Sequence, residues 1–282
     1  MNKLTIDRQA QVVKALCEGN SIRATSRMSG VAINTVVKLL QDLGSACLDY
    51  QDEVMHDLTC QRLQCDEIWS FIYSKARNVP KEHEGEFGYG DVWTWTAIDA
   101  DTKLMPCWHV GGRTAEDALD FMANLRSRLS NRVQLTTDGH KPYLEAIEGA
   151  FGADVDYAML QKIYGHQSTE GQRRFSPPEC IGASTHVVTG SPDNAYISTS
   201  YVERANLTMR MSMRRFTRLT NGFSKKLENH MHAIALHFAF YNFCRPHKTL
   251  SKPYQRTPAM AAGLTDHVRT VEELLGLLDR SN

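Results

Sequence analysis

The chain has 282 residues, and its 32 Lys and Arg residues balance 32 Asp and Glu residues, so the formal net charge is zero. Hydrophobic residues make up 42% of the chain and charged residues 23%, which is typical of a folded protein and excludes a largely disordered one. The sequence contains no uncharged apolar run of about 18 residues, so we expect no membrane partner and a cytoplasmic location.

The charges are distributed unevenly along the chain. Residues 201–256 contain 11 Lys or Arg against two Asp or Glu, whereas residues 59–200 contain 13 basic and 19 acidic residues. A cationic segment beside an acidic one is typical of a protein that binds a polyanion and a metal ion. A solvated helix face is the alternative explanation of the cationic segment.

The first 45 residues predict three short helices, followed by a polar connector over 45–59. Ser21 is suited to cap the second helix, and Gly30 lies in the turn before the third, which is expected to run over 35–43 and to end at Gly44. Two short helices joined by a turn that contains glycine predict a helix-turn-helix, whose second helix enters the major groove of DNA. A plain three-helix packing module is the alternative.

The middle of the chain predicts an α/β fold with a mixed five-stranded sheet. The pattern changes there to runs of β-forming residues separated by two helices, in the order β-β-β-α-β-α-β. The expected strands are 62–73, 92–98, 104–110, 133–137 and 157–163, and the expected helices are 114–129 and 141–151. A long loop over 165–200, helices over 201–219 and 224–243, and a tail with a short helix over 271–278 follow.

Three carboxylates stand out against this pattern. Asp66 lies inside an apolar strand, where an ionised group is costly unless it is paired or bound to metal. Asp138 ends the fourth strand, at the sheet edge where α/β proteins place functional groups, and a helix crossing the sheet can bring Glu203 to the same edge. Each residue also has a structural explanation. Asp66 could be a solvated strand residue, Asp138 a turn former or helix cap, and Glu203 a partner of the helix dipole.

Cations follow the third carboxylate. At 100° per residue on one helix, Arg210 and Arg214 lie within about 20° of Glu203, so one face would carry the carboxylate and groups that bind phosphate. The expected DNA-binding residues are Thr35, Lys38, Arg204, Arg210, Arg214, Arg215, Arg218, Lys225, Lys226 and Arg245.

Several motifs resemble the DDE transposases of the insertion-sequence-one family, which are encoded by bacterial insertion elements. They are Asp66-Glu-Ile-Trp, Thr136-Thr-Asp138-Gly-His140, Tyr201-Val-Glu203-Arg-x-Asn-x-x-x-Arg210 and Tyr241-Asn-x-x-Arg245-Pro-His247. The resemblance covers most of the chain from about residue 63 to 250. It implies an RNase H-like fold and an acid triad of Asp66, Asp138 and Glu203 that serves as both catalytic and metal-binding set.

The resemblance also implies a division of the chain and a reaction. Residues 1–58 would form the DNA-binding domain, 59–250 the catalytic domain with 165–200 as an insertion, and 251–282 the tail. Two Mg²⁺ or Mn²⁺ ions would support DNA cleavage and strand transfer at the ends of an insertion sequence, with a homo-oligomer assembled on the terminal repeats and target DNA. Seven cysteines without a Cys-x-x-Cys pair give no reason to expect zinc.

Some residues and functions stay open at this point. His140 is a possible assisting residue, while Glu67 is expected to point to the opposite sheet face from Asp66 and to be structural. Trp93 and Trp95 are expected to pack in the core rather than to stack on bases. Alternatives to a transposase are an RNase H-like nuclease without strand transfer and an inactive helix-turn-helix regulator.

Overall fold

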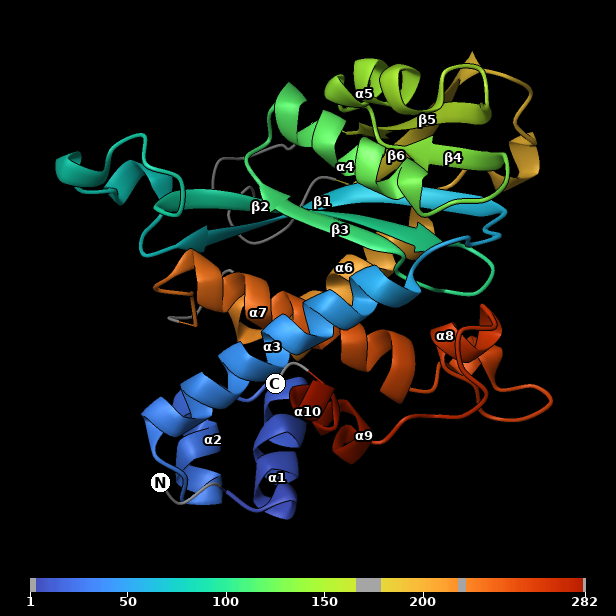
Figure 1. The fold of residues 1–282 in the computed structure, drawn as a ribbon. Helices are drawn as coiled ribbons and strands as arrows, with labels where there is room; N and C mark the ends of the chain where they lie inside the picture. Colours follow the sequence, from blue (N-terminus) through green and yellow to red (C-terminus); the bar gives the residue numbers. More distant parts are fainter. Residues whose placement is uncertain (1–3, 166–178, 218–221, 281–282) are drawn as a thin grey trace.

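A six-stranded mixed sheet forms the centre of the protein (Figure 1). The computed structural model describes residues 4–165, 179–217 and 222–280. The strands are β1 (Arg62–Ile72), β2 (Gly90–Asp99), β3 (Cys107–Gly111), β4 (Val133–Thr137), β5 (Val155–Tyr164) and β6 (Cys180–Thr189). They lie in the order β3-β2-β1-β4-β5-β6, with β4 and β5 parallel to β1 and the other pairs antiparallel. The first five strands have the order and directions of an RNase H-like fold, which confirms the predicted fold class.

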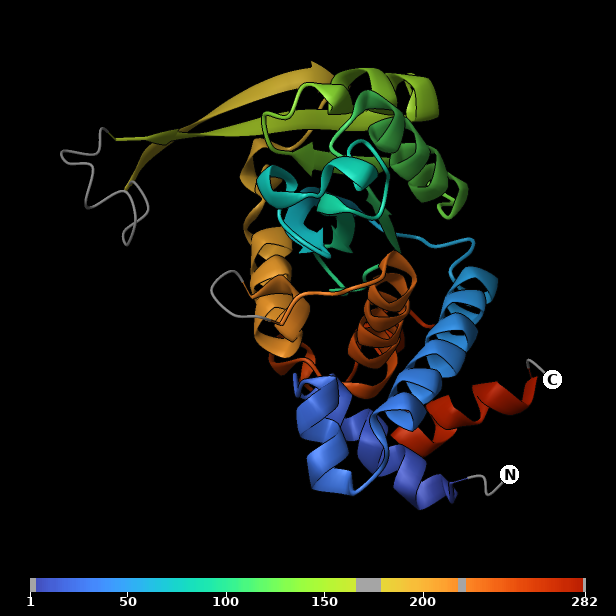
Figure 2. The same cartoon turned by 90° about the vertical axis from the view of Figure 1, so that its left-hand side faces the viewer.

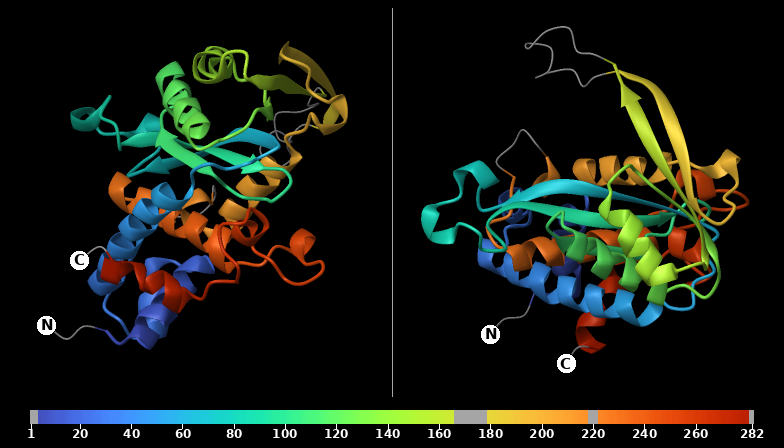
Figure 3. Two further views of the ribbon diagram at one scale, coloured as in Figure 1. Left: turned by 45° about the vertical axis from the view of Figure 1, so that its right-hand side comes forward. Right: turned by 90° about the horizontal axis from the view of Figure 1, so that it is seen from above.

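Helices cover both faces of the sheet. Within the described ranges they are α1 (Ile6–Cys17), α2 (Ile22–Ser29), α3 (Ile33–Val54), α4 (Ala115–Ser127), α5 (Pro142–Phe151), α6 (Ser200–Ser212), α7 (Leu227–Ala239), α8 (Pro258–Ala261), α9 (Val271–Leu275) and α10 (Leu277–Arg280). Figure 1 shows α4 and α5 on one side of the sheet and α6 and α7 on the other, with α3 lying along α7. In the view from above in Figure 3, β5 (yellow-green) and β6 (yellow) extend side by side away from the other elements.

The alternation of side chains along β1 explains why both faces are covered. Leu63 and Cys65 are buried in one hydrophobic cluster together with Phe121 of α4. Ile68 and Ile72 are buried in a second cluster with residues of α6 and α7. Because successive residues of a strand point to opposite faces, an apolar strand of this kind needs cover on both sides.

α2 and α3 are two helices joined by a short turn, as expected from the sequence, and DNA binding by residues 1–58 stays a prediction. α2 and α3 meet at 115° across a turn in which Gly30 has φ of +66°, and the Ser21 side chain accepts a hydrogen bond from the amide of Ala24. No single helix in the described chain is long and apolar enough to cross a membrane, and α2 with α3 meets that criterion only as this bent pair.

The expected third helix, 35–43, is too short. α3 begins at Ile33 and continues to Val54, so Gly44 lies inside the helix instead of ending it. At Gly44 the backbone of α3 passes so close to His232 of α7 that a Cβ would lie 2.5 Å from the His232 Cβ. The glycine is therefore a point of close helix packing, which sequence pattern alone does not distinguish from a helix stop.

The sheet has one strand more than predicted. β6 lies inside 165–200, which was expected to be a loop, and pairs antiparallel with β5. Figure 2 shows that β5 and β6 extend together as a ribbon beyond the helices. Because β6 is exposed along most of its length, its sequence lacks the apolar alternation that marks a half-buried strand. Residues 166–178 of the expected loop lie outside the described chain.

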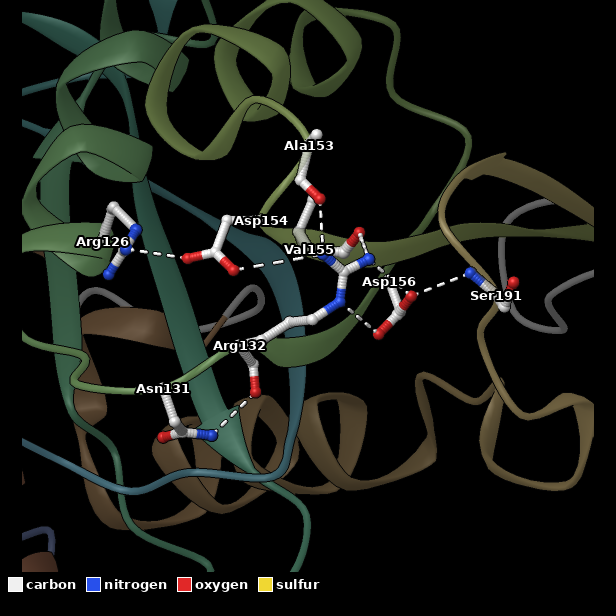
Figure 4. Close-up of polar contacts among 8 residues, drawn as sticks. All are labelled: Arg126, Asn131, Arg132, Ala153, Asp154, Val155, Asp156 and Ser191. Carbon is white, nitrogen blue, oxygen red and sulfur yellow. Dashed lines mark hydrogen bonds and ion pairs between the residues drawn. The ribbon is translucent and has the colours of Figure 1, made fainter.

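An ion-pair network fixes the start of β4 and β5 (Figure 4). Arg132, directly before β4, donates from Nε and Nη2 to the two carboxylate oxygens of Asp156, each at 2.8 Å, and also to the carbonyl of Val155. Asp156 accepts a further hydrogen bond from the amide of Ser191, directly after β6. The network holds three strand ends together at the opposite end of β4 from Asp138.

Candidate active site

The pairing of β1 with β4 brings Asp66 and Asp138 together. The two strands run parallel, and Cys65 is the partner of Thr137. The next residues, Asp66 on β1 and Asp138 after β4, therefore lie side by side. Ligand oxygens of Asp66, Asp138 and Glu67 all lie within 4.8 Å of one another. The predicted adjacency of the first and fourth strands is therefore correct.

Hydrogen bonds hold both aspartates in place. Asp66 accepts from the amide of Glu67 through Oδ1 and from the Asn206 side chain through Oδ2, each at 2.9 Å. Oδ1 of Asp138 accepts from the amide of His140, also at 2.9 Å. Burial, reinforced by the charge of Asp138, raises the pKa of Asp66 to about 6. A bound cation would relieve both causes.

Glu67 also lies in this acidic cluster, and the structural role predicted for it stays a prediction. Its side chain faces Tyr143 of α5 and Arg113, on the other side of the sheet from Asn206, so the predicted direction is correct. The Glu67 carboxylate nevertheless lies close to both aspartates. Burial raises the pKa of Glu67 to about 7.

The start of α6 positions Glu203. Oε1 of the buried Gln64 on β1 accepts hydrogen bonds from the amides of Tyr201 and Val202, at 2.8 and 3.2 Å. These are two of the amides that a helix start leaves without partners, so Gln64 ties α6 to the sheet. The Glu203 carboxylate accepts from the Thr199 hydroxyl at 2.6 Å and forms an ion pair with Lys162 of β5. It lies outside the group of three close carboxylates.

One hollow contains all three predicted carboxylates. It has a volume of about 700 Å³, and Asp66, Asp138 and Glu203 line it. Three cationic side chains, Arg113, Lys141 and Lys162, line the same hollow. Acidic and cationic groups that line one hollow would attract a divalent cation and a phosphate together.

His140 also lines this hollow, where its pKa is lowered mainly by burial and secondly by Arg113. Within the described chain its buried Nε2 has no hydrogen-bond partner. The ring lies 5.7 Å from that of Trp95, which is fully buried as predicted. Trp93 is only half-buried, and its ring lies beneath the guanidinium of Arg113.

The donor set fits a hard divalent cation. Each ligand atom of the Asp66, Glu67 and Asp138 group is a carboxylate oxygen, and Mg²⁺ and Mn²⁺ prefer such ligands. Glu67 is the member of this group that already pairs with a cation, because its Oε2 accepts a hydrogen bond from Nε of Arg113. The arrangement can therefore hold a metal ion beside a phosphate.

The expected DNA-binding cations lie in different surroundings. Arg204, Arg214, Lys225, Lys226 and Arg245 are exposed, as are Thr35 and Lys38 on α3, and Lys38 forms an ion pair with Asp42. Arg210 and Arg215 are half-buried, and Arg218 lies outside the described residues.

Arg214 does not share a helix face with Glu203. α6 ends at Ser212, Met213 is extended, and Arg214 begins a short 3₁₀ turn, so the predicted helix over 201–219 is too long. The buried side chains of Met213 and Phe216 explain the break, because they turn the chain back toward the core. Arg210 keeps its place on the helix face of Glu203.

Sequence reasoning missed Arg113, Lys162 and Asn206. The spacing of Asn206, three residues after Glu203, is a signal that was available, since such residues share a helix face. Arg113 follows the Gly111-Gly112 pair at the end of β3, and Lys162 lies in the second half of β5, among residues that are exposed or half-buried. Neither has a local pattern that singles it out, because only the strand order brings them to the carboxylates.

Comparisons with known proteins give a distant similarity in structure. No family model matches the sequence, and no curated protein matches it. Among solved structures, the chain is similar to the piggyBac transposase in its synaptic complex with hairpin DNA, with a TM-score of 0.44 and 10% identity, over 99% of this chain and 71% of that one. The functional assignment therefore depends on the geometry of the site.

Proposed function

We propose that this protein is a DNA transposase of the insertion-sequence-one type, which cleaves and joins DNA strands at the ends of its element. The observation that carries the proposal is the meeting of Asp66 and Asp138 at one edge of the sheet, in a hollow that Glu203 also lines. Carboxylates gathered in this way in an RNase H-like fold suit phosphodiester chemistry.

Asp66, Asp138 and Glu203 are the residues proposed to hold divalent metal, Mg²⁺ or Mn²⁺. When bound, such ions supply Lewis acidity and neutralise the charge that develops on phosphate oxygens. The chain itself fixes the site in advance: Asn206 orients Asp66, His140 orients Asp138, and Gln64 and Thr199 orient Glu203 through α6. Carboxylates that hydrogen bonds already hold in position need little rearrangement during the reaction.

DNA is the proposed partner, at two places on the chain. Residues 1–58 contain the helix-turn-helix, whose exposed Thr35 and Lys38 would read the terminal repeats. Exposed cations between 204 and 245 would contact the phosphate backbone. Residues 59–250 remain the proposed catalytic region and 251–282 the tail, with assembly of a homo-oligomer on paired ends.

The test replaces single carboxylates. Asp66→Asn and Asp138→Asn should lower single-turnover cleavage of a duplex ending in the repeat that flanks the gene by at least about 10³-fold, because they remove negative oxygen ligands without changing side-chain volume. Binding of the same duplex, followed by fluorescence anisotropy, should change less than about threefold. Strand-transfer products on paired ends would distinguish a transposase from a nuclease of the same fold.

Asp154→Asn is the matched control. Asp154 is a half-exposed carboxylate that pairs with Arg126, away from the hollow, so its replacement should leave cleavage unchanged. Undiminished cleavage by Asp66→Asn would refute the site. If even the wild-type protein binds the repeat but does not cleave it with Mg²⁺ or Mn²⁺, the protein is a DNA-binding regulator instead.

A further inference from the structure

We propose that Arg113 binds the phosphate that is cleaved, and that Glu67 and Trp93 are the residues that position it. This inference rests on the proposed function, since it names a substrate contact within the same site. Arg113 lines the hollow that contains Asp66, Asp138 and Glu203, and its Nη2 lies 4.0 Å from Oδ2 of Asp138.

Glu67 anchors the guanidinium from behind. Nε and Nη2 of Arg113 each lie 3.1 Å from Oε2 of Glu67. The Glu67 side chain is 1% exposed, whereas that of Arg113 is 39% exposed, so the acid is fixed in the protein and the base reaches the surface. An ion pair with one buried member holds its geometry far better than a pair between two mobile surface chains.

Trp93 fixes the plane of the same group. The Cζ atom of Arg113 lies 4.8 Å from the centroid of the Trp93 ring, which is cation–π distance. The indole supports one face of the guanidinium and Glu67 occupies one edge. In the described chain Nη1 has no hydrogen-bond or ion-pair partner, so a donor edge beside the carboxylates is left for a ligand.

The turn that carries Arg113 is also rigid. A Cβ at Gly111 would lie 1.8 Å from a carboxylate oxygen of Asp117, a side chain that is held by hydrogen bonds with His109 and Thr114. The Trp95 indole donates to the carbonyl of Gly112 at 3.0 Å, and the Thr114 side chain caps α4 directly after Arg113. A short turn held on both sides presents its arginine in one place.

These contacts favour a phosphate over other ligands. A planar guanidinium with a free donor edge matches the paired oxygens of a phosphodiester. A phosphate held by Arg113 would lie next to Asp66 and Asp138, where a metal ion would also be held. If Arg113 were only the counterion of Glu67, its removal would not change how the protein responds to the charge of the substrate.

The experiment therefore varies the protein and the phosphate together. Arg113→Ala, Arg113→Lys and wild type are compared on the repeat-ended duplex and on the same duplex with an uncharged methylphosphonate at the cleaved position. We expect Arg113→Ala to slow single-turnover cleavage by about 10²-fold or more, with Lys recovering only part of the loss. The methylphosphonate penalty is the factor by which the uncharged duplex is cleaved more slowly than the ordinary one. This penalty should be at least about tenfold smaller in Arg113→Ala than in wild type. An unchanged penalty would overturn the inference.

The matched control is Arg126→Ala. Arg126 is 34% exposed and pairs with Asp154, so it resembles Arg113 in exposure but lies away from the hollow. Its replacement should change neither the rate nor the methylphosphonate penalty. Asp66→Asn separates the two proposals. If this variant still cleaves DNA, the proposed active site is wrong. If it does not cleave, but Arg113→Ala keeps the wild-type methylphosphonate penalty, only the phosphate contact is wrong.

Glu67 is tested as a positioning residue by its dependence on Arg113. Glu67→Gln should slow cleavage in the wild-type background but have no further effect in Arg113→Ala. Binding of Mn²⁺, measured by calorimetry, should persist in Glu67→Gln and be lost in Asp66→Asn. Independent effects in the double variant, or loss of Mn²⁺ binding by Glu67→Gln, would show that Glu67 does not act through Arg113.

Discussion

A chain of buried polar residues joins the sheet to α7. His230, which is fully buried, contacts Ser70 of β1 through Nε2 at 3.2 Å and Ser224 through Nδ1 at 3.0 Å. Ser224 in turn accepts a hydrogen bond from Arg215. Burial, followed by the charge of Arg215, lowers the pKa of His230 to about 3. The histidine is therefore neutral in the folded protein and serves as a fixed connection rather than as a metal ligand.

This pKa predicts how stability depends on pH. An unfolded histidine takes up a proton near pH 6.5, but folded His230 cannot, so the free energy of unfolding should fall as pH drops below about 6.5. The slope from this residue approaches about 1.4 kcal/mol per pH unit between about pH 6 and pH 4. In His230→Gln that part of the slope should disappear when urea unfolding is measured across the range. Parallel curves for the two proteins would contradict the prediction.

At the level of single residues, the sequence identifies unusual carboxylates better than it predicts which side chains contact them. Asp66 and Asp138 were identifiable because a carboxylate in an apolar strand or at its end is unusual. Arg113 and Glu67 were not, since an arginine after two glycines and a second acid beside Asp66 have ordinary structural explanations. Their roles depend on the order of the strands, which a local pattern does not contain.

At the level of elements, the packing of α3 on α7 connects the amino-terminal helices to the helices that cover the sheet. The two helices approach at Gly44, where a Cβ would lie 2.6 Å from the carbonyl oxygen of His232. Gln51, further along α3, donates to the carbonyl of Ala235 at 3.1 Å. The sequence predicts the amphipathic first half of α3 correctly, but it cannot show that the helix continues, because continuation depends on this partner.

Gly44→Ala should therefore destabilise the protein. The added methyl group forces apart two backbones rather than a flexible side chain, so we expect a loss of about 1–3 kcal/mol in the free energy of unfolding, measured with urea. Gly149→Ala is the matched control, because it lies in α5 and its nearest neighbour is a side-chain atom of Leu119 at 3.8 Å. There the better helix propensity of alanine should raise stability by up to about 1 kcal/mol. Equal effects at both glycines would refute the close approach.

At the level of the whole molecule, a net charge of zero results from separate charged regions. Asp66 and Asp138 line the first hollow, while a second hollow of about 880 Å³ lies between the amino-terminal helices and α7. Its lining includes the cations Arg23, Arg214, Arg215 and Lys225. The sequence predicts the cationic segment, but only the fold shows that it faces the helix-turn-helix.

This arrangement predicts the salt dependence of DNA binding. Arg214→Ala with Lys225→Ala removes two exposed cations from one wall of the second hollow. If each contacts a phosphate, the slope of log Kd against log salt concentration should fall by about 2, because each contact releases roughly one counterion.

The comparison variant removes the same charge elsewhere. Lys14→Ala with Arg126→Ala eliminates two cations that pair with Glu272 and Asp154, away from both hollows. Its slope, measured by fluorescence anisotropy over the same salt series, should match wild type to within about 0.5. Equal slopes for both double variants and wild type would mean that Arg214 and Lys225 form only a solvated face, and that DNA is held by the helix-turn-helix without this wall.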